Sequence, residues 1–478
     1  MVFNSIIFLL YLPIVFLLYW FVFKRLKWQN IFVIIASYIF YGWWDWRFLT
    51  LIAFTSLCSF LSGILIDKSK IRRNKKIVLS INIIINLGIL AIFKYFNFFT
   101  SNIQLILSPL GIHLDTITLN LILPVGISFY TFQALSYSID VYRGKISATN
   151  DIFAFFAFIS FFPQLVAGPI ERATNLLPQF LKPRVFDYSL AVDGCRQILW
   201  GLFKKMVIAD NCSILVNETF SNYSSLGGIN LWIGALFFTF QIYGDFSGYS
   251  DIAIGTAKLF DIRLMTNFKL PYFSRDIAEF WRRWHISLNT WFVDYVYIPL
   301  GGSRHGKSKL VRNTFVIFLL SGLWHGAEWT FVLWGTYNAI LFIPLTVLNL
   351  NKKHIDIVAQ NSFVPSFKES LMMGCTFMLV MVGWVIFRAD NLQIAVDYLT
   401  RMFTDFHFTK PLKGKFCLIY ICIMLVIEWL QRKRNHTFDF TGIKIMGHKT
   451  VRWIIYCTIA MMILMFQGEN SDFIYFQF

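Results

Sequence analysis

Long apolar runs are the feature that most constrains what this chain can fold into. Stretches of about 20 residues with almost no charge recur along the chain, and short basic segments separate them. A run of that length crosses the hydrocarbon core of a bilayer as one helix. Charged residues make up 14% of the chain, whereas soluble proteins carry about a quarter. The sequence therefore predicts an all-α, polytopic membrane protein.

The usual span length predicts about eleven or twelve crossings in a single transmembrane domain over 1–478. The run 152–170 contains two prolines and a glycine. Irregular backbone at membrane depth must be covered by protein or line a cavity, so we expect a re-entrant segment there. The section 258–312 is basic and less apolar, and we expect it to be cytoplasmic or interfacial. The other spans are expected near 5–23, 31–44, 48–66, 77–97, 121–139, 197–213, from 231 onward, 313–323, 329–350, 369–387, 416–430 and 451–467.

Basic residues predict the orientation, because cytoplasmic loops are enriched in Lys and Arg. The densest basic cluster, at 68–76, lies on the same side as the basic residues at 24–27, two spans earlier. The segments 100–120 and 209–230 contain no Lys or Arg and are expected outside the cytoplasm. The N-terminus is therefore expected to be extracytoplasmic. This loop charge also explains the net charge of +17 without a nucleic-acid partner.

Familiar soluble motifs are absent from the sequence. It has no G-x-G-x-x-G, P-loop, H-E-x-x-H or G-x-S-x-G pattern. Seven cysteines form no Cys-x-x-Cys pair, so we interpret them as packing residues and expect no metal site. The candidates for chemistry are instead polar residues at positions where a bilayer makes them costly.

The first candidate is His325, which lies between two strongly apolar runs. Gly322 and Gly326 around it form a pair that lets another backbone approach closely. The histidine is either a packing residue or a general base, since an imidazole can accept a hydroxyl proton at neutral pH. Glu328 could orient the ring if the helix continues past it.

The second candidate is His285, within the segment 279–291. Apolar residues at 277, 281, 284, 288 and 291 predict one stripe along an interfacial amphipathic helix, with tryptophans at headgroup level. His285 lies at the margin of this stripe, beside Arg282 and Asn289. It is either an ordinary interface residue or a catalytic one.

The third candidate is the polar run 241–251, which closes an apolar span. Asp245 and Asp251 either pair with arginines and hold the helices together or line a polar tunnel.

Taken together and in this order, these segments resemble the membrane-bound O-acyltransferase superfamily, in particular its alginate and peptidoglycan O-acetyltransferase branch. The matching stretches are LPVGISFYTFQ at 123–133, FFPQLVAGPIE at 161–171, YGDFSGYSD at 243–251, FWRRWHISL at 280–288, YIPLGGS at 297–303, LWHG at 323–326 and FIYFQF at 473–478.

The resemblance implies that His325 and His285 are catalytic and that the helices form a funnel-shaped bundle. It also implies that acetyl moves from a cytoplasmic thioester, acetyl-CoA, to hydroxyls of an extracytoplasmic polysaccharide, directly or through an SGNH-type partner protein. The expected location is the bacterial inner membrane, in contact with lipid, and no permanently bound cofactor is expected. Residues expected to line the substrate path are Gln133, Asp245, Ser247, Tyr249, Asp251, Arg282, Asn289 and Trp324.

Two other functions remain open on the residues alone. One is D-alanyl transfer to teichoic acid. The other is a transporter or flippase for a polysaccharide precursor, with Asp245, Asp251 and His325 as its path.

Overall fold

A computed structural model of the chain describes residues 1–110, 119, 122–166, 168–304, 306–409, 414, 416–468 and 473–474. Within these ranges every regular element is a helix. The chain divides into two compact units, one of residues 1–188 and 259–264 and the other of residues 189–258 and 265–478.

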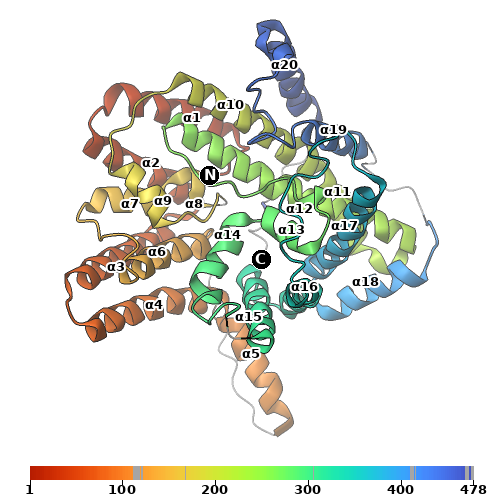
Figure 1. The fold of residues 1–478 in the computed structure, drawn as a ribbon, viewed down its shortest axis with the longest axis horizontal. Helices are drawn as coiled ribbons and strands as arrows, with labels where there is room; N and C mark the ends of the chain where they lie inside the picture. The colour runs from red at the N-terminus through yellow and green to blue at the C-terminus, as the bar shows by residue number, and fades with distance from the viewer. Residues whose placement is uncertain are drawn as a thin grey trace. The chain divides into compact units, whose positions relative to one another are not determined.

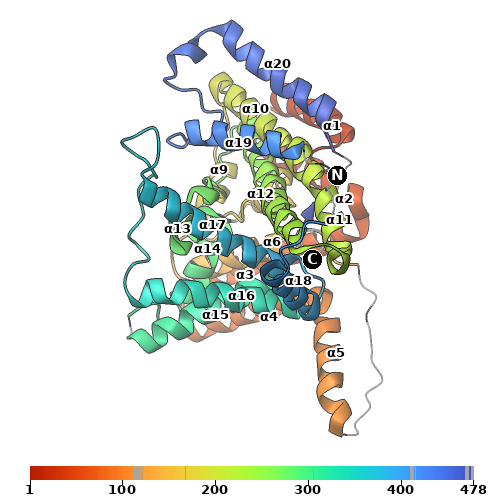
Figure 2. The same ribbon diagram turned by 90° about the vertical axis from the view of Figure 1, so that its right-hand side faces the viewer.

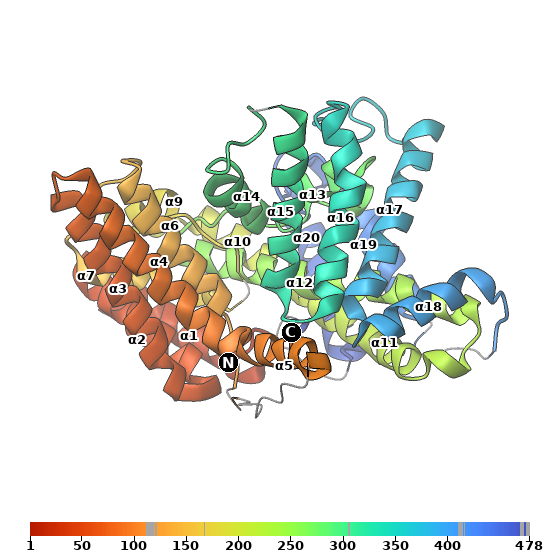
Figure 3. The same ribbon diagram turned by 90° about the horizontal axis from the view of Figure 1, so that it is seen from below.

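In the first unit, α3, α4 and α6 pack against one another, and α7 packs on α2, α3 and α9. Figure 1 shows α3, α4 and α6 side by side, and Figure 3 shows the same neighbours from below. The helices of this unit are α1 (Ile6–Leu17), α2 (Leu26–Asp45), α3 (Leu49–Lys68), α4 (Arg72–Lys94), α5 (Phe96–Leu107), α6 (Ile127–Tyr142), α7 (Ile152–Ser160), α8 (Phe162–Leu165) and α9 (Ala173–Phe180).

In the second unit, α15, α16 and α17 lie in sequence, with α13 against α16 and α17. Figure 2 shows α15 and α16 running alongside each other. Its helices are α10 (Tyr188–Leu202), α11 (Asp210–Ser221), α12 (Gly228–Leu259), α13 (Ile277–Arg283), α14 (Ile286–Phe292), α15 (Lys307–His325), α16 (Trp329–Val347), α17 (Phe367–Arg388), α18 (Leu392–Thr404), α19 (Cys417–Leu430) and α20 (Lys449–Phe466).

Among the described residues, five helical segments are long and apolar enough to cross a membrane. They carry large apolar side chains on their outer faces, such as Ile84 and Leu464, which are 68% and 73% exposed. Such a surface suits lipid and not water. The five segments are Leu26–Lys68, Arg72–Lys94, Trp329–Val347, Phe367–Arg388 and Lys449–Phe466, and two shorter apolar helices are Ile6–Val22 and Cys417–Leu430.

Most expected spans coincide with helices, but two expectations about local structure are wrong. The segment 209–230, expected as an outside loop, contains α11. The segment 100–120 begins inside α5, its residues 111–118 and 120–121 lie outside the described ones, and its expected place outside the cytoplasm stays a prediction. The polar run at 243–251 does not end its span, because α12 continues to Leu259. The expected irregular segment 152–170 is indeed broken, into α7 and α8. The crossing count, the single domain and the cytoplasmic section 258–312 stay predictions.

Glycines set how closely α10 and α12 approach. A Cβ on Gly201 would lie 2.6 Å from the carbonyl oxygen of Gly248, and one on Gly255 would lie 2.5 Å from that of Gly194. Only glycine at these positions permits such backbone contact. A π-helical turn, Phe203–Ala209, joins α10 to α11. It carries Lys204 and Lys205 toward the polar run of α12.

Candidate active site

His325 is the last residue of α15, and the chain leaves the helix at Gly326 in an extended conformation. The imidazole is 4% exposed. Its ring centroid lies 5.0 Å from that of Trp324, 5.2 Å from Trp334 and 5.2 Å from Phe387. Three consecutive helices, α15, α16 and α17, therefore build an aromatic pocket around one histidine.

The predicted glycine pair does allow close packing here. A Cβ on Gly322 would lie 2.2 Å from the carbonyl oxygen of Phe331, and one on Gly326 would lie 2.0 Å from the Phe331 ring. The prediction that Glu328 could orient the His325 ring depended on a continuous helix. The helix ends at His325, and Glu328 is an exposed residue at the N-cap position of α16, where its side chain makes no capping hydrogen bond. Glu328 is therefore not placed to orient the ring.

The expected amphipathic helix around His285 is wrong in two respects. It is broken into α13 and α14, because His285 adopts the left-handed conformation with φ 44° and ψ 52°. Its tryptophans are also buried inside the protein and do not face outward toward headgroups: Trp281 is 7%, Trp284 1% and Trp291 6% exposed. The chain changes direction at His285, between α13 and α14, and the apolar side chains of both helices face the aromatic core of the second unit.

The His285 ring lies in a polar notch among aromatic rings. Its Nδ1 lies 3.1 Å from Oδ1 of Asn267 and 3.4 Å from the Ser287 hydroxyl. Phe246 packs edge-on at 4.6 Å between centroids. His285 lies outside the helical segments that are long and apolar enough to cross a membrane. Burial lowers the pKa of its imidazole to about 3. The ring is therefore neutral at pH 7, the form that can accept a proton.

Trp324 brings the two histidines into one cluster. Its ring centroid lies 5.7 Å from that of His285 and 5.0 Å from that of His325. The indole is buried, at 4% exposure. The rings of His285 and His325, which lie 40 positions apart in the sequence, therefore both pack against the same indole.

The polar run of α12 forms buried ion pairs, and their cations are lysines, not the expected arginines. Lys205 Nζ lies 2.8 Å from both Asp245 and Asp210, and Lys204 Nζ lies 2.6 Å from Asp251. Lys204 also donates to the Ser247 hydroxyl at 2.9 Å. These contacts tie the π-helical turn to α12.

Tyr249 continues the same face of α12 and packs on Phe473 at 4.3 Å between centroids. The backbone N–H of Ile474 donates to Asp245 at 2.6 Å. The matching motif FIYFQF is thus in contact with α12 at its first two residues, and its residues 475–478 lie outside the described ones.

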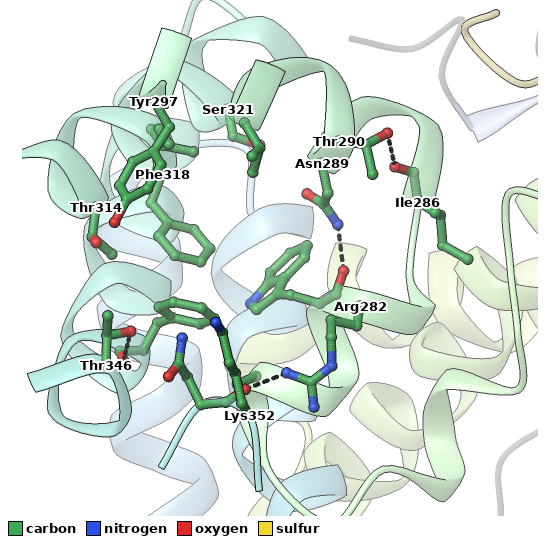
Figure 4. A pocket seen from close by; sticks show the side chains of 16 residues that line it. Arg282, Ile286, Asn289, Thr290, Tyr297, Thr314, Phe318, Ser321, Thr346 and Lys352 are labelled. Carbon is green, nitrogen blue, oxygen red and sulfur yellow. Dashed lines mark hydrogen bonds between the residues drawn. The ribbon is translucent and has the colours of Figure 1, made fainter. Parts of the chain in front are cut away.

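A cavity of about 580 Å³ lies between α13–α14 and the α15–α16 hairpin. In Figure 4, Arg282 and Lys352 lie at one end and Ser321 at the other. Ser321 is one helical turn before His325, and Trp281 lines the cavity while contacting Trp334 at 5.5 Å between centroids. The inner wall of the cavity is therefore next to the His325 pocket.

Of the predicted site residues, Arg282 and Asn289 line this cavity. The Arg282 guanidinium donates to the backbone carbonyls of Asn351 and His354. The Asn289 amide donates to the carbonyls of Trp281 and Trp284, at 2.7 and 2.6 Å. Both side chains therefore also fix the end of α13.

Gln133 belongs to the first unit. Its amide donates to the carbonyl of Phe158 at 2.8 Å, and the Gln164 amide donates to the same oxygen at the same distance. The two amides thus provide hydrogen-bond donors for a backbone carbonyl in the last turn of α7, where the helix ends. Asn267, in contrast, contacts His285 but was not among the predicted residues. It is 18 positions away in an irregular segment, and no local spacing links the two.

Comparison with known proteins places these features in a family. The sequence model described as the membrane-bound O-acyltransferase family matches residues 38–358. The protein named "probable alginate O-acetylase" in Pseudomonas putida is 36% identical over the whole of both chains. The peptidoglycan O-acetyltransferase of Helicobacter pylori is 34% identical over 84% of this chain and 80% of its own. The teichoic acid D-alanyltransferase of Bacillus subtilis is 28% identical over 56% of this chain and 69% of its own. The chain belongs to the membrane-bound O-acyltransferase family and is a multi-pass membrane O-acyltransferase.

Proposed function

We propose that this enzyme transfers acetyl groups from acetyl-CoA on the cytoplasmic side to hydroxyls of an extracytoplasmic polysaccharide. The observation that carries the proposal is the pair of buried histidines in contact with Trp324. The named activities of the relatives with full or near-full coverage, alginate and peptidoglycan O-acetylation, support acetyl as the group moved.

The chemistry is acyl transfer from an activated donor. His325 acts as the general base and removes the proton from the attacking hydroxyl. The hydroxyl oxygen bonds to the carbonyl carbon of the thioester, the carbon–sulfur bond then breaks, and the proton passes from the imidazole to the departing thiolate. His285 is either a second proton carrier or a hydrogen-bond donor to the carbonyl oxygen as it gains charge. The aromatic walls exclude water, which would otherwise hydrolyse the thioester.

The cavity beside α13–α14 suits the arm of a thioester donor. Its walls are mostly apolar, and Arg282 and Lys352 lie at one end. Lys352 and Lys353 follow a membrane span and are the kind of basic pair that marks the cytoplasmic side. Positive charge at that mouth favours the phosphates of coenzyme A. Its inner wall reaches Ser321, one turn from His325. We therefore propose that the donor enters from the cytoplasmic face and brings its acetyl group to the histidines.

The acceptor and the location follow the same reasoning. We propose a bacterial inner-membrane enzyme with an extracytoplasmic N-terminus, acting on a polysaccharide directly or through an SGNH-type partner. D-alanyl transfer is the second candidate, because a teichoic acid D-alanyltransferase is also similar, though over 56% of this chain. Export of a polysaccharide precursor is the candidate outside acyl transfer.

The test replaces His325 with alanine in cells that make the polymer. We expect His325→Ala to insert in the membrane at the wild-type level yet lose polymer acetylation. His448→Ala is the matched control, because His448 is an exposed histidine before α20, and it should acetylate normally. Chemical analysis of ester-linked groups on the polymer separates acetyl from alanyl. Intact acetylation together with failed export in the His325→Ala cells would contradict the proposal.

A further inference from the structure

We infer that Asn267 is a positioning residue that holds His285 with its proton on Nδ1, so that Nε2 enters the reaction as a proton acceptor. The inference rests on the proposed function and decides between the two roles open to His285. Asn267 and Ser287 are 0% exposed, and His285 is 1% exposed. Solvent therefore does not set the hydrogen bonding of this ring, and the side chains around it do.

The identity of the asparagine atom that faces the ring comes from a backbone contact. The N–H of Ser287 points at Oδ1 of Asn267, at 3.3 Å, and a backbone N–H can only donate. The atom it meets must therefore be the amide oxygen, because the reversed amide would set two donors against each other. The Ser287 hydroxyl donates to the same oxygen at 2.9 Å.

The tautomer of the imidazole then follows. Nδ1 of His285 lies 3.1 Å from this oxygen, which has lone pairs and no proton to give. An unprotonated Nδ1 would place two acceptors against each other in a buried site, where no water replaces the missing hydrogen bond. Nδ1 therefore carries the proton, and in the neutral ring the lone pair is on Nε2. A hydrogen bond on one ring nitrogen commonly fixes the role of the other in this way.

Asn267 is itself fixed on both sides. Its Nδ2 donates to the hydroxyl of Ser250 on α12, at 3.1 Å. Its backbone carbonyl accepts the N–H of Ile286 at 2.9 Å. The second contact holds the chain next to His285, whose left-handed backbone is strained in a residue other than glycine. The same asparagine therefore supports the strained backbone of His285 and orients its ring.

The consequence is chemical. Because the Nδ1 proton is donated to Oδ1 of Asn267, the neutral ring accepts a proton at Nε2 and does not donate from it. His285 therefore takes a proton during the reaction and returns it, and the donor to the carbonyl oxygen is a different group. His325 removes the proton from the attacking hydroxyl, Nε2 of His285 receives that proton and passes it to the departing thiolate sulfur, and both rings end as they began.

The experiment compares Asn267→Ala and Asn267→Asp in inside-out membrane vesicles supplied with acetyl-CoA, measuring release of the CoA thiol. Asn267→Ala removes the acceptor, and we expect kcat to fall about 10- to 100-fold with little change in KM for acetyl-CoA, as for other residues that orient a catalytic group. Asn267→Asp keeps an oxygen facing Nδ1, and the Ser250 hydroxyl can donate to its second oxygen. We expect this variant to restore activity.

The aspartate variant also predicts a shift that a merely structural role would not produce. A carboxylate beside Nδ1–H stabilises the imidazolium and raises the pKa of His285. The protonated base is inactive, so the acid limb of the rate should move to higher pH than in the wild type. Asn86→Ala is the control for losing a buried amide, because the hydrogen bonds of the Asn86 side chain in α4 go, within the described part of the chain, to Asn82. This variant should leave kcat unchanged.

Two results would overturn the inference. One is full activity in Asn267→Ala. The other is an Asn267→Asp variant that is present in the membrane but as inactive as Asn267→Ala. Failure of the proposed function is a separate outcome, since wild-type vesicles would then release no more CoA thiol than vesicles from cells without this enzyme, whatever the residue at 267.

Discussion

The contact between α15 and α16 makes Gly322 a sensitive test of how the site is held. A methyl group there would lie 2.2 Å from the carbonyl oxygen of Phe331, whereas ordinary contact begins at 3.4 Å. The two helices must therefore separate by about 1.2 Å in Gly322→Ala, because the obstacle is backbone and cannot rotate away. Overpacking of this kind costs about 1–3 kcal/mol.

The displacement matters because His325 follows Gly322 by three residues on the same helix. A shift of about 1 Å in a catalytic group can lower a rate about 100-fold. We therefore expect Gly322→Ala to lose most polymer acetylation, while its unfolding temperature in detergent falls by only a few degrees. Gly335→Ala, whose methyl would lie 2.4 Å from the Phe318 carbonyl oxygen, should behave in the same way.

The matched control is Gly374→Ala in α17, where a methyl would meet nothing within 4 Å. Alanine favours a helix over glycine by about 1 kcal/mol, so this variant should be as stable as the wild type or slightly more so, and fully active. Acetyl ester on the polymer and thermal unfolding of purified protein are measured together. Wild-type acetylation in Gly322→Ala would refute the claim that this helix contact positions His325.

Two ion-pair predictions concern stability. Burial alone would raise the pKa of Asp193, but its contacts with His436 and Lys258 lower it to about 2, from 3.8. The carboxylate therefore stabilises the folded state by at most about 2 kcal/mol above pH 3.8, and this contribution is lost as the pH falls toward 2. The stability gap between wild type and Asp193→Asn should close over that interval, and a gap independent of pH would contradict the assignment. Lys205→Met leaves two buried carboxylates without their cation, so we expect a loss of about 3–5 kcal/mol and poor membrane yield. Lys353→Met, at an exposed lysine, should cost nothing, and equal yields of the two variants would show that the buried pairs are dispensable.

The helices of this protein were predictable because apolar runs of membrane length leave few other structures open. The expected span 329–350 matches α16 (Trp329–Val347), and 369–387 matches α17 (Phe367–Arg388). The polar run of α12 misled the prediction for a physical reason. Its carboxylates looked too costly for a helix interior, but Lys204 and Lys205 neutralise them from a neighbouring helix. A partner that lies about 40 positions away leaves no trace in local hydropathy.

His325 and His285 were both predicted as site residues, yet only the fold shows that both rings pack against Trp324. Periodicity favoured one continuous helix through His285, because residues 277–291 repeat at helical spacing. Tertiary contacts override it: the backbone of Asn267 bonds to Ile286, and that of Lys269 bonds to Arg283 at 2.9 Å. These two backbone hydrogen bonds come from a segment outside the helix, so the sequence of the helix itself cannot predict them.

The break at His285 also explains why a rule of local structure is violated at this position. In a continuous helix His285 would have helical φ and ψ, and the N–H groups of Ile286 and Ser287 would donate to carbonyls four residues earlier in the same helix. With the left-handed turn, the N–H groups of Ile286 and Ser287 instead bond to Asn267. The strain at one residue thus aligns an amide oxygen with an imidazole nitrogen and places Trp324 against the ring. Proteins whose local sequence preferences otherwise agree with the fold tolerate a strained backbone where a functional side chain must be oriented. The left-handed backbone of His285 is therefore an observation that supports the proposed reaction centre independently of the burial of the two histidines.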